Sequence, residues 1–183
     1  MKIFSEYADF HPSQVLKFCP FCGAKTFLWD GEKAHKCATC GKKMYTNEAA
    51  ATVALITNDK GELLFVRRKF NPAKGMLDLP GGFVDLGETA EQAIVREVKE
   101  ELNLDVDELQ FFGSFPNQYL FGGLLYFTLD MTFICKVRDF SPLRAADDAE
   151  EFLFIAPEKV SIEEIGLGSI KEVVKRFLTP PSP

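Results

Sequence analysis

Four cysteines form two short pairs that restrict how the first part of this 183-residue chain can fold. Cys19 and Cys22 make one C-x2-C pair, Cys37 and Cys40 make the other, and 14 residues separate the two pairs. Each pair can grip one tetrahedral ion from a tight turn, and four thiolates form a common structural zinc site. Two disulfides fit the spacing poorly, because cysteines this close in sequence seldom reach disulfide geometry. The spacing therefore predicts a bound Zn²⁺.

The segment around these cysteines is too short to bury a core of its own, so we expect its metal to fold it. We interpret it as a small zinc ribbon that acts as a structural clip, with nucleic-acid recognition as the alternative. His35 is surplus to a site with four thiolates, His11 has no evident partner, and both are expected at the surface. The predicted organisation is an N-terminal extension, the ribbon, a main domain and a tail, over residues 1–14, 15–47, 48–178 and 179–183.

Composition excludes several classes of protein. Hydrophobic residues make up 46% of the chain, which is typical of a globular protein with a buried core. The net charge of -6 argues against binding of duplex nucleic acid through bulk electrostatics, although Lys33, Lys36, Lys42 and Lys43 make the ribbon locally basic. No apolar run reaches membrane-spanning length, and an odd number of cysteines fits a reducing compartment. We expect a cytoplasmic protein with no membrane association.

Hydrophobic periodicity predicts an α/β main domain. Apolar runs on both sides of residues 58–61 indicate a hairpin, and Ile94, Val98 and Leu102 give residues 88–102 an amphipathic helical pattern. Phe111, Phe127 and Phe133 fall in apolar strand-like runs and are expected in the core. The predicted strands cover residues 52–57, 62–68, 109–115, 124–137 and 151–156, and further helices cover 158–165 and 168–178.

Three glutamates on the first of these helices suggest a metal site. Glu97, Glu100 and Glu101 are spaced i, i+3 and i+4, so their like charges share one stripe of the helix. A hard cation such as Mg²⁺ would offset that repulsion, and its remaining waters can be replaced by a substrate phosphate. The preceding Pro80-Gly81-Gly82 turn lets backbone groups approach the same ion. The glutamates alone would also fit an ordinary solvated helix face.

The whole array from Gly82 to Leu104 resembles the Nudix box, G-x5-E-x7-R-E-U-x-E-E-x-G-U, where U is an aliphatic residue. One specified position differs, because Asn103 stands where the box has glycine. Asparagine accepts the left-handed conformation that a helix C-terminus needs, so the fold is unaffected. The resemblance covers residues 50–178 and implies the Nudix α/β/α sandwich with a mixed sheet, preceded here by the zinc ribbon. That combination is similar to the NADH-pyrophosphatase-like branch of the MutT-related enzymes.

The resemblance also implies a reaction and the residues that perform it. Nudix enzymes hydrolyse a nucleoside diphosphate linked to a second moiety X, using Mg²⁺ or Mn²⁺. Here Glu97, Glu100 and Glu101 would hold the metal with the Gly81 carbonyl. Arg96 would orient Glu97 and pair with Glu88. The general base would be a box glutamate or a later acidic residue, and of Asp147, Asp148, Glu150 and Glu151 we favour Glu151.

The nature of X is left open by the sequence. Arg67 and Arg68 could bind phosphate, and Phe115, Asn117 and Tyr119 could contact a base or nicotinamide ring if the Pro116-Asn117 step forms a turn. NADH pyrophosphatases carry S-Q-P-W-P-F-P-x-S here, and most of it is missing. ADP-ribose or a related ADP-X compound is therefore the preferred substrate, with NADH or NAD as the alternative.

A different class of function is a nucleotide-sensing regulator whose ribbon contacts nucleic acid. The intact box glutamates favour turnover instead, because a pure sensor could lose them without harm. We expect a nucleotide as the partner and consider nucleic acid a weaker candidate. The 18 phenylalanines would permit an apolar homodimer interface.

Overall fold

The computed structural model describes residues 5–145 and 149–179. Contacts between Cα atoms divide the chain into two units. One unit comprises the residues up to Ala49 together with Gln118–Phe127, and the other comprises Ala50–Asn117 together with the residues from Thr128 onward. The segment 118–127 is the tip of a long hairpin, so the first unit contains a piece of the chain far from the ribbon in sequence.

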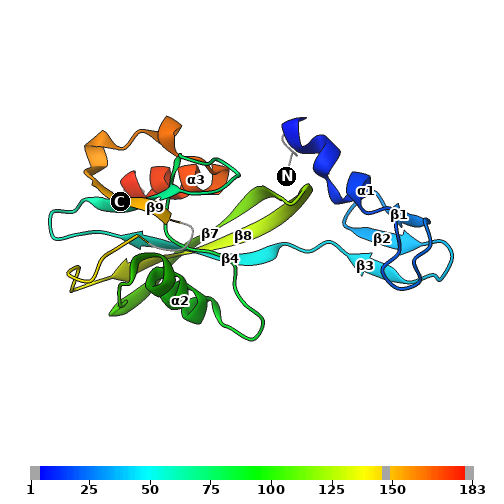
Figure 1. Ribbon diagram of the computed structural model, residues 1–183, viewed down its shortest axis with the longest axis horizontal. Coiled ribbons are helices and arrows are strands. Elements are labelled where there is room, and N and C mark those ends of the chain that lie inside the picture. Colours follow the sequence, from blue (N-terminus) through cyan, green and yellow to red (C-terminus); the bar gives the residue numbers. More distant parts are fainter. Residues whose placement is uncertain (1–4, 146–148, 180–183) are drawn as a thin grey trace. The chain divides into compact units, whose positions relative to one another are not determined.

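The first unit contains a three-stranded antiparallel sheet in the order β1-β2-β3. Its strands are β1 (Phe27–Trp29), β2 (Ala34–Cys37) and β3 (Lys43–Tyr45), and they are preceded by a 3-10 helix over Ser5–Phe10 and by α1 (Pro12–Val15) (Figure 1). Phe27, Cys19 and Cys37 form its small buried cluster, against which Leu16, Ala24 and Met44 pack. A cluster this small contributes little hydrophobic stability, as expected for a metal-folded module.

Both histidines differ from the prediction that they are surface residues. His35 is fully buried, stacks on Phe27 with ring centroids 4.9 Å apart, and meets Trp29 edge-on. The His11 ring packs against Trp29 and Phe127, at 5.1 and 5.6 Å, and its Nδ1 accepts a hydrogen bond from the backbone N–H of Ser13. The ribbon has few aliphatic residues, so flat imidazole rings take their place in its interior.

The second unit has two three-stranded sheets flanked by two helices. One sheet has the order β4-β8-β7 and the other has the order β6-β5-β9. The elements are β4 (Ala49–Ile56), β5 (Leu63–Arg68), β6 (Leu77–Asp78), α2 (Ala90–Leu102), β7 (Glu108–Phe121), β8 (Leu124–Lys136), β9 (Ala149–Ile155) and α3 (Gly168–Leu178).

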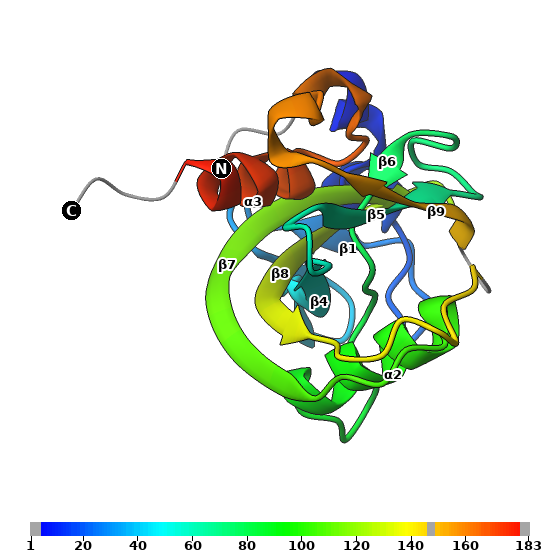
Figure 2. The same cartoon turned by 90° about the vertical axis from the view of Figure 1, so that its left-hand side faces the viewer.

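Alternating residues of β4 and β5 separate the core into two layers. Ala54, Ile56, Leu64 and Val66 pack toward α2, whereas Val53, Leu55, Leu63 and Phe65 pack toward α3. Both strands are therefore buried on both faces, and α2 and α3 lie on opposite sides of the strands (Figure 1, Figure 2). The predicted α/β/α sandwich is confirmed. The β6-β5-β9 sheet is mixed, because β5 pairs antiparallel with β6 and β9 while Leu77 of β6 forms a parallel bridge with Ile165.

The hairpin predicted around residues 58–61 forms only at its turn. Thr57 and Leu63 make one antiparallel bridge, and the Gly61 N–H donates to the Asn58 carbonyl. Beyond that bridge β4 and β5 enter different sheets. Besides β6, the strand β5 pairs with β9, which lies more than 80 residues later, from Leu63 opposite Ile155 to Arg68 opposite Ala149.

The predicted helices had different outcomes. The helix expected over 168–178 is confirmed as α3. The helix expected over 158–165 is wrong, because two 3-10 turns, Pro157–Lys159 and Ile162–Glu164, stand there instead. Ile165 is fully buried and bridges Leu77, and the Gly166 N–H donates to the Leu77 carbonyl. These sheet contacts hold the chain extended where a helix would have to continue.

Within the described ranges, no helix is both long enough and apolar enough to cross a membrane.

Candidate active site

Helix α2 presents the predicted carboxylates, and both of its ends are fixed by hydrogen bonds. Thr89 and Gln92 form a capping box, in which each side chain accepts from the backbone N–H of the other, at 3.3 and 2.9 Å. Asn103 ends the helix in the left-handed conformation, at φ 55° and ψ 28°, as predicted for this position. Its side-chain amide donates to the Pro142 carbonyl at 3.0 Å. The buried stripe of Ile94, Val98 and Leu102 fixes the rotation of the helix.

Arg96 donates hydrogen bonds to carboxylates of the helix and of the loop before it. Its Nε and Nη2 donate to the two oxygens of Glu88, at 2.9 and 3.0 Å. Its Nη1 donates both to Glu97 Oε1 at 2.8 Å and to Glu100 Oε2 at 3.0 Å. The hydrogen bond from Arg96 lowers the pKa of Glu88, and the same bond raises the pKa of Arg96. Three glutamates of the box therefore converge on one cationic side chain.

The glycine turn lies directly against these glutamates. The Gly81 N–H donates to Glu101 Oε2 at 3.1 Å, and the Glu101 side chain is buried. A Cβ on Gly82 would lie 2.4 Å from Glu97 Oε1. The turn is also joined to β4, because the backbone N–H groups of Thr52 and Ala54 donate to the Gly82 and Pro80 carbonyls, both at 2.8 Å. Segments far apart in sequence thus meet at one edge of the helix.

Replacing Gly81 by alanine should destabilise the protein strongly. Gly81 has a φ of 148°, and an added Cβ would lie 2.0 Å from the Thr52 carbonyl oxygen, a backbone atom that cannot turn away. We expect a loss of about 3 kcal/mol in the free energy of unfolding, as for an overpacked core site. Urea denaturation measures it. Gly168→Ala is the control, because a Cβ added there would meet nothing within 4 Å and its φ is ordinary. Equal stability of the two variants would contradict the close packing of the turn.

The two predicted phosphate-binding arginines are both held by acidic partners. Arg67 Nε donates to Glu151 Oε1 at 2.5 Å, and its Nη1 donates to the Gly75 carbonyl at 2.7 Å. Arg68 pairs with the buried Asp78. Burial raises the pKa of Asp78, and the charge of Arg68 opposes that rise. Glu151, the favoured base, thus lies on β9 beside β5. Two further candidates, Asp147 and Asp148, lie outside the described residues.

The predicted ring-binding residues lie within a continuous strand. β7 runs through Pro116 and Asn117, so the expected turn is absent and the prediction that it lifts these side chains out of the sheet is wrong. Phe115 stacks on Phe112, and Tyr119 stacks on Phe121. Of the three phenylalanines expected in the core, Phe133 is buried and Phe127 is partly buried, whereas Phe111 is exposed and touches Phe133 only by its ring edge.

Asn117 belongs to a buried polar network that the sequence pattern does not reveal. Its centre is Asp130 on β8, whose carboxylate accepts hydrogen bonds from Ser169 Oγ at 2.5 Å and Thr128 Oγ1 at 2.7 Å, and also from Asn117. Burial raises the pKa of Asp130, and these hydrogen bonds oppose that rise. The only signal in the sequence is a single acidic residue inside the long apolar run of β8. The network ties β7 and β8 to the first turn of α3.

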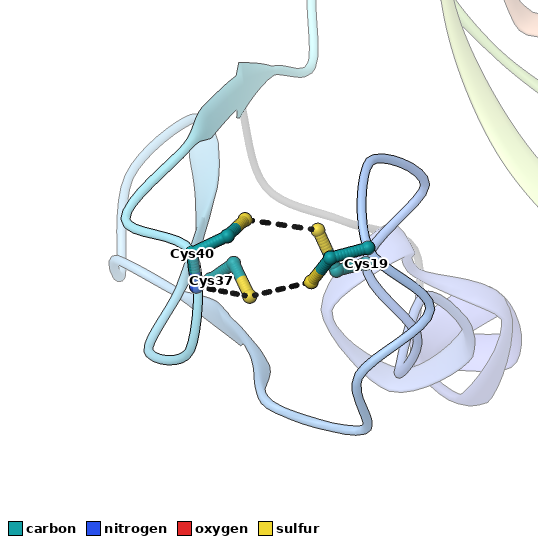
Figure 3. A group of neighbouring side chains, drawn as sticks. Cys19, Cys37 and Cys40 are labelled. Carbon is teal, nitrogen blue, oxygen red and sulfur yellow. Dashed lines mark hydrogen bonds between the residues drawn. The ribbon is translucent and has the colours of Figure 1, made fainter.

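The four cysteines of the ribbon come together as predicted, and Figure 3 shows Cys19, Cys37 and Cys40 among them. Their sulfur atoms all lie within 4.8 Å of one another, and Cys19–Cys40 and Cys22–Cys37 are each 3.7 Å apart. A tetrahedral ion with Zn–S bonds of about 2.3 Å would separate its sulfurs by about 3.8 Å. In the part of the chain that the structure describes, no other group of three or more potential metal ligands is gathered this tightly.

The pKa values of the cysteine thiols also indicate a site that needs a bound cation. The backbone N–H of Cys40 donates to Cys37 Sγ at 3.4 Å and, with the Thr26 hydroxyl, lowers the pKa of Cys37 to about 6. The Ala24 N–H lowers the pKa of Cys22, but desolvation and hydrogen bonds with the other three thiols raise it to about 12. Four thiolates this close need a cation to ionise together. Geometry and donor chemistry therefore both fit a tetrathiolate metal site.

Solved structures define the general class of this fold. A NUDIX hydrolase from Nitrosomonas europaea matches with a TM-score of 0.65 at 22% identity, over 88% of this chain and 90% of that one. A MutT protein from Methanosarcina mazei matches with a TM-score of 0.56 at 23% identity, over 73% and 95%. The α/β/α sandwich with its glutamate-bearing helix is thus a MutT/Nudix fold.

The family follows from the sequence itself. The NUDIX domain model matches residues 47–177, so the chain belongs to the NUDIX family. It is 32% identical over 136 residues to the NAD-capped RNA hydrolase NudC of Vibrio atlanticus, and 36% identical over 119 residues to that of Haemophilus influenzae. These matches cover 74% and 62% of this chain but 50% and 45% of the relatives. The chain spans about half the length of these relatives.

Proposed function

We propose that the protein is a divalent-metal-dependent pyrophosphohydrolase that cleaves the pyrophosphate bond of an ADP-X compound. The observation that carries this proposal is the arrangement of three glutamates on α2 of a NUDIX domain, in which Glu97 and Glu101 lie against the Gly81-Gly82 turn and Arg96 holds Glu97 together with Glu100. Structural neighbours support the fold alone. The activity is inferred from the site.

Glu97, Glu100, Glu101 and the Gly81 carbonyl would hold Mg²⁺ or Mn²⁺. Their oxygens are the ligands that such hard cations prefer, and two of the carboxylates already share the cationic Nη1 of Arg96. When bound, the metal would neutralise pyrophosphate charge and lower the pKa of a coordinated water. Zn²⁺ would occupy the separate tetrathiolate site, where it folds the ribbon. Retention of four thiolates fits a reducing, cytoplasmic location.

The chain's own residues would orient the reacting groups. Arg96 keeps Glu97 aligned through one guanidinium nitrogen while its other two nitrogens hold Glu88 in the loop. The two glycines let the turn pack closely beside the helix, because a side chain on Gly81 would collide with the Thr52 carbonyl and one on Gly82 with Glu97. Glu151 remains our candidate base outside the box. Arg67 donates a hydrogen bond to its carboxylate, so during the reaction Glu151 would either leave Arg67 or accept the proton while still paired with it. Arg67 and Arg68 remain candidates for phosphate contact.

Two candidate substrates differ in the group X that is attached to ADP. ADP-ribose is the form preferred from the sequence, because most of the NADH-pyrophosphatase motif is missing after the box. NAD or NADH is the second candidate, and it is favoured by the NAD group in the name of the relatives that are 32 to 36% identical, NAD-capped RNA hydrolase. Phe115, Asn117 and Tyr119 stay candidates for binding the ring of either form, from positions within β7.

A substrate panel tests this proposal. With Mg²⁺ present, we expect the protein to release AMP from ADP-ribose or from NADH, with a kcat/KM at least about 10²-fold above that for 8-oxo-dGTP or a diadenosine polyphosphate. Anion-exchange chromatography of the products measures both the rate and the bond cleaved. EDTA should abolish turnover. Failure to cleave any pyrophosphate on the panel would refute the proposed activity.

A further inference from the structure

The three-stranded sheet of the ribbon has one buried face and one exposed face. Cross-strand pairing places Leu28 opposite Lys36, and Lys36 opposite Lys43, so these three side chains share a face. Tyr45 follows Lys43 by two residues and lies on the same side. All four are exposed. The other face carries Phe27, His35 and Cys37, which are buried.

Aromatic rings and lysines occur together on the exposed surface of this unit. Lys43 Nζ lies 5.0 Å from the centre of the Tyr45 ring. In the cysteine turns, Lys42 Nζ lies 4.9 Å from the centre of the Phe21 ring, and Lys25 Nζ lies 5.9 Å from that of Phe18. Phe18, Phe21, Leu28 and Tyr45 are 62, 51, 62 and 52% exposed. Exposed apolar side chains that gather in one region, unlike single ones, mark interaction sites.

The charge of the ribbon is opposite to that of the rest of the chain. Residues 15–47 contain six lysines and two acidic residues, a net charge of +4, whereas the remaining residues carry -10. A tetrathiolate zinc site would contribute -2 and leave the ribbon positive. Among the described residues, only Lys43 of these lysines has an ion pair, with Asp30 at 3.0 Å. Lys25, Lys36 and Lys42 are exposed cations whose charge is available to a ligand.

We propose that the ribbon binds single-stranded nucleic acid through the exposed face of its sheet, which carries Leu28, Lys36, Lys43 and Tyr45, and through the cysteine turns, which carry Phe18, Phe21, Lys25 and Lys42. Exposed rings offer faces on which unpaired bases can stack, and lysine ammonium groups beside them can meet the phosphates that connect those bases. Because lysine side chains are flexible, each ammonium group can move away from its aromatic ring and contact the phosphates of the nucleic acid. In a duplex the base faces are stacked on each other, so a duplex could bind this surface only through its phosphate charges. The surface shares no residue with the α2 glutamate cluster, so this inference does not depend on hydrolysis.

Fluorescence anisotropy of the zinc-loaded full chain with a labelled 12-nucleotide single-stranded RNA tests the inference. We expect salt-dependent binding that is stronger than binding to the duplex of the same sequence. Lys36→Glu combined with Lys42→Glu should weaken it at least tenfold and reduce the slope of log affinity against log salt by about 1.4, as for the loss of two phosphate contacts. Tyr45→Ala should weaken binding while leaving the slope unchanged, because stacking releases no counterions.

The matched control is Lys60→Glu combined with Lys74→Glu, which makes the same charge change at exposed sites of the other unit. It should bind RNA like the wild type. Zinc content and hydrolysis by each variant show that it is folded. No RNA binding by the wild type, equal weakening by both double variants, or equal binding of single strand and duplex would each overturn the inference. So would binding only to vesicles containing phosphatidylserine, which would indicate a membrane surface instead.

Discussion

Glu100→Gln should lower kcat by about 10²- to 10⁴-fold while leaving the fold nearly unchanged. The substitution keeps the shape of the side chain but removes the charge that would bind a divalent ion, and a metal site supplies several kcal/mol to such a reaction. The Glu100 side chain is 48% exposed, and its main contact is the 3.0 Å ion pair with Arg96. Exposed pairs of this kind contribute about 0–1 kcal/mol, so the melting temperature should change little.

Steady-state hydrolysis of the best substrate on the panel measures the effect, and a Mg²⁺ titration separates loss of metal from loss of substrate. Glu91→Gln is the matched control, because Glu91 is exposed in the first turn of the same helix. It should keep wild-type turnover. If Glu100→Gln turned over as fast as Glu91→Gln at saturating Mg²⁺, Glu100 would not be a metal ligand.

The features that the sequence predicts well are determined by residues near one another along the chain. The capping box of Thr89 and Gln92, the apolar stripe of α2 and the left-handed Asn103 all act within a few residues of each other. The two C-x2-C pairs are likewise local turns, and tetrahedral chemistry sets the distance between them. For the same reason the helix over 168–178 is predicted with the bounds that it has in the structure.

The features that the sequence misses depend on distant segments. β5 turns away from its neighbour β4 to pair with β9, and the contact of Ile165 with Leu77 prevents the helix expected there. Pro116-Asn117 looks like a turn, but the hydrogen bond from Asn117 to Asp130 fixes it inside β7. His35 is buried because the ribbon has few aliphatic residues to fill its core. Local propensity carries no information about such partners.

The net charge of the whole chain hides an uneven distribution of charged residues. A net charge of -6 argues against nucleic acid for the chain as a whole. The first unit carries a net charge of +2, of which residues 15–47 contribute +4, whereas the second unit carries -8. Screening over about 8–10 Å makes the local charge the one that a bound phosphate encounters. The ribbon can therefore attract an anionic strand although the whole protein is acidic.

Removal of zinc should unfold the ribbon. Its buried cluster contains only Cys19, Phe27 and Cys37, and two of these three residues are proposed ligands. Structural zinc contributes an apparent binding free energy of about 10–16 kcal/mol in small domains, far more than such a cluster can supply. Cys19→Ser should therefore abolish stoichiometric zinc binding and remove the protection of amides in β1, β2 and β3 against hydrogen exchange.

Cys135→Ala provides the control, because Cys135 is the cysteine outside the cluster and is buried in β8, where burial raises its pKa to about 12. It should retain one zinc per chain and an intact ribbon, with only the modest loss of stability expected for a small cavity in the second unit. Metal analysis and exchange measured by mass spectrometry separate these outcomes. A zinc-free wild type with protected ribbon amides would show that the ribbon folds without a metal. Its stability would then come from the aromatic core around His35.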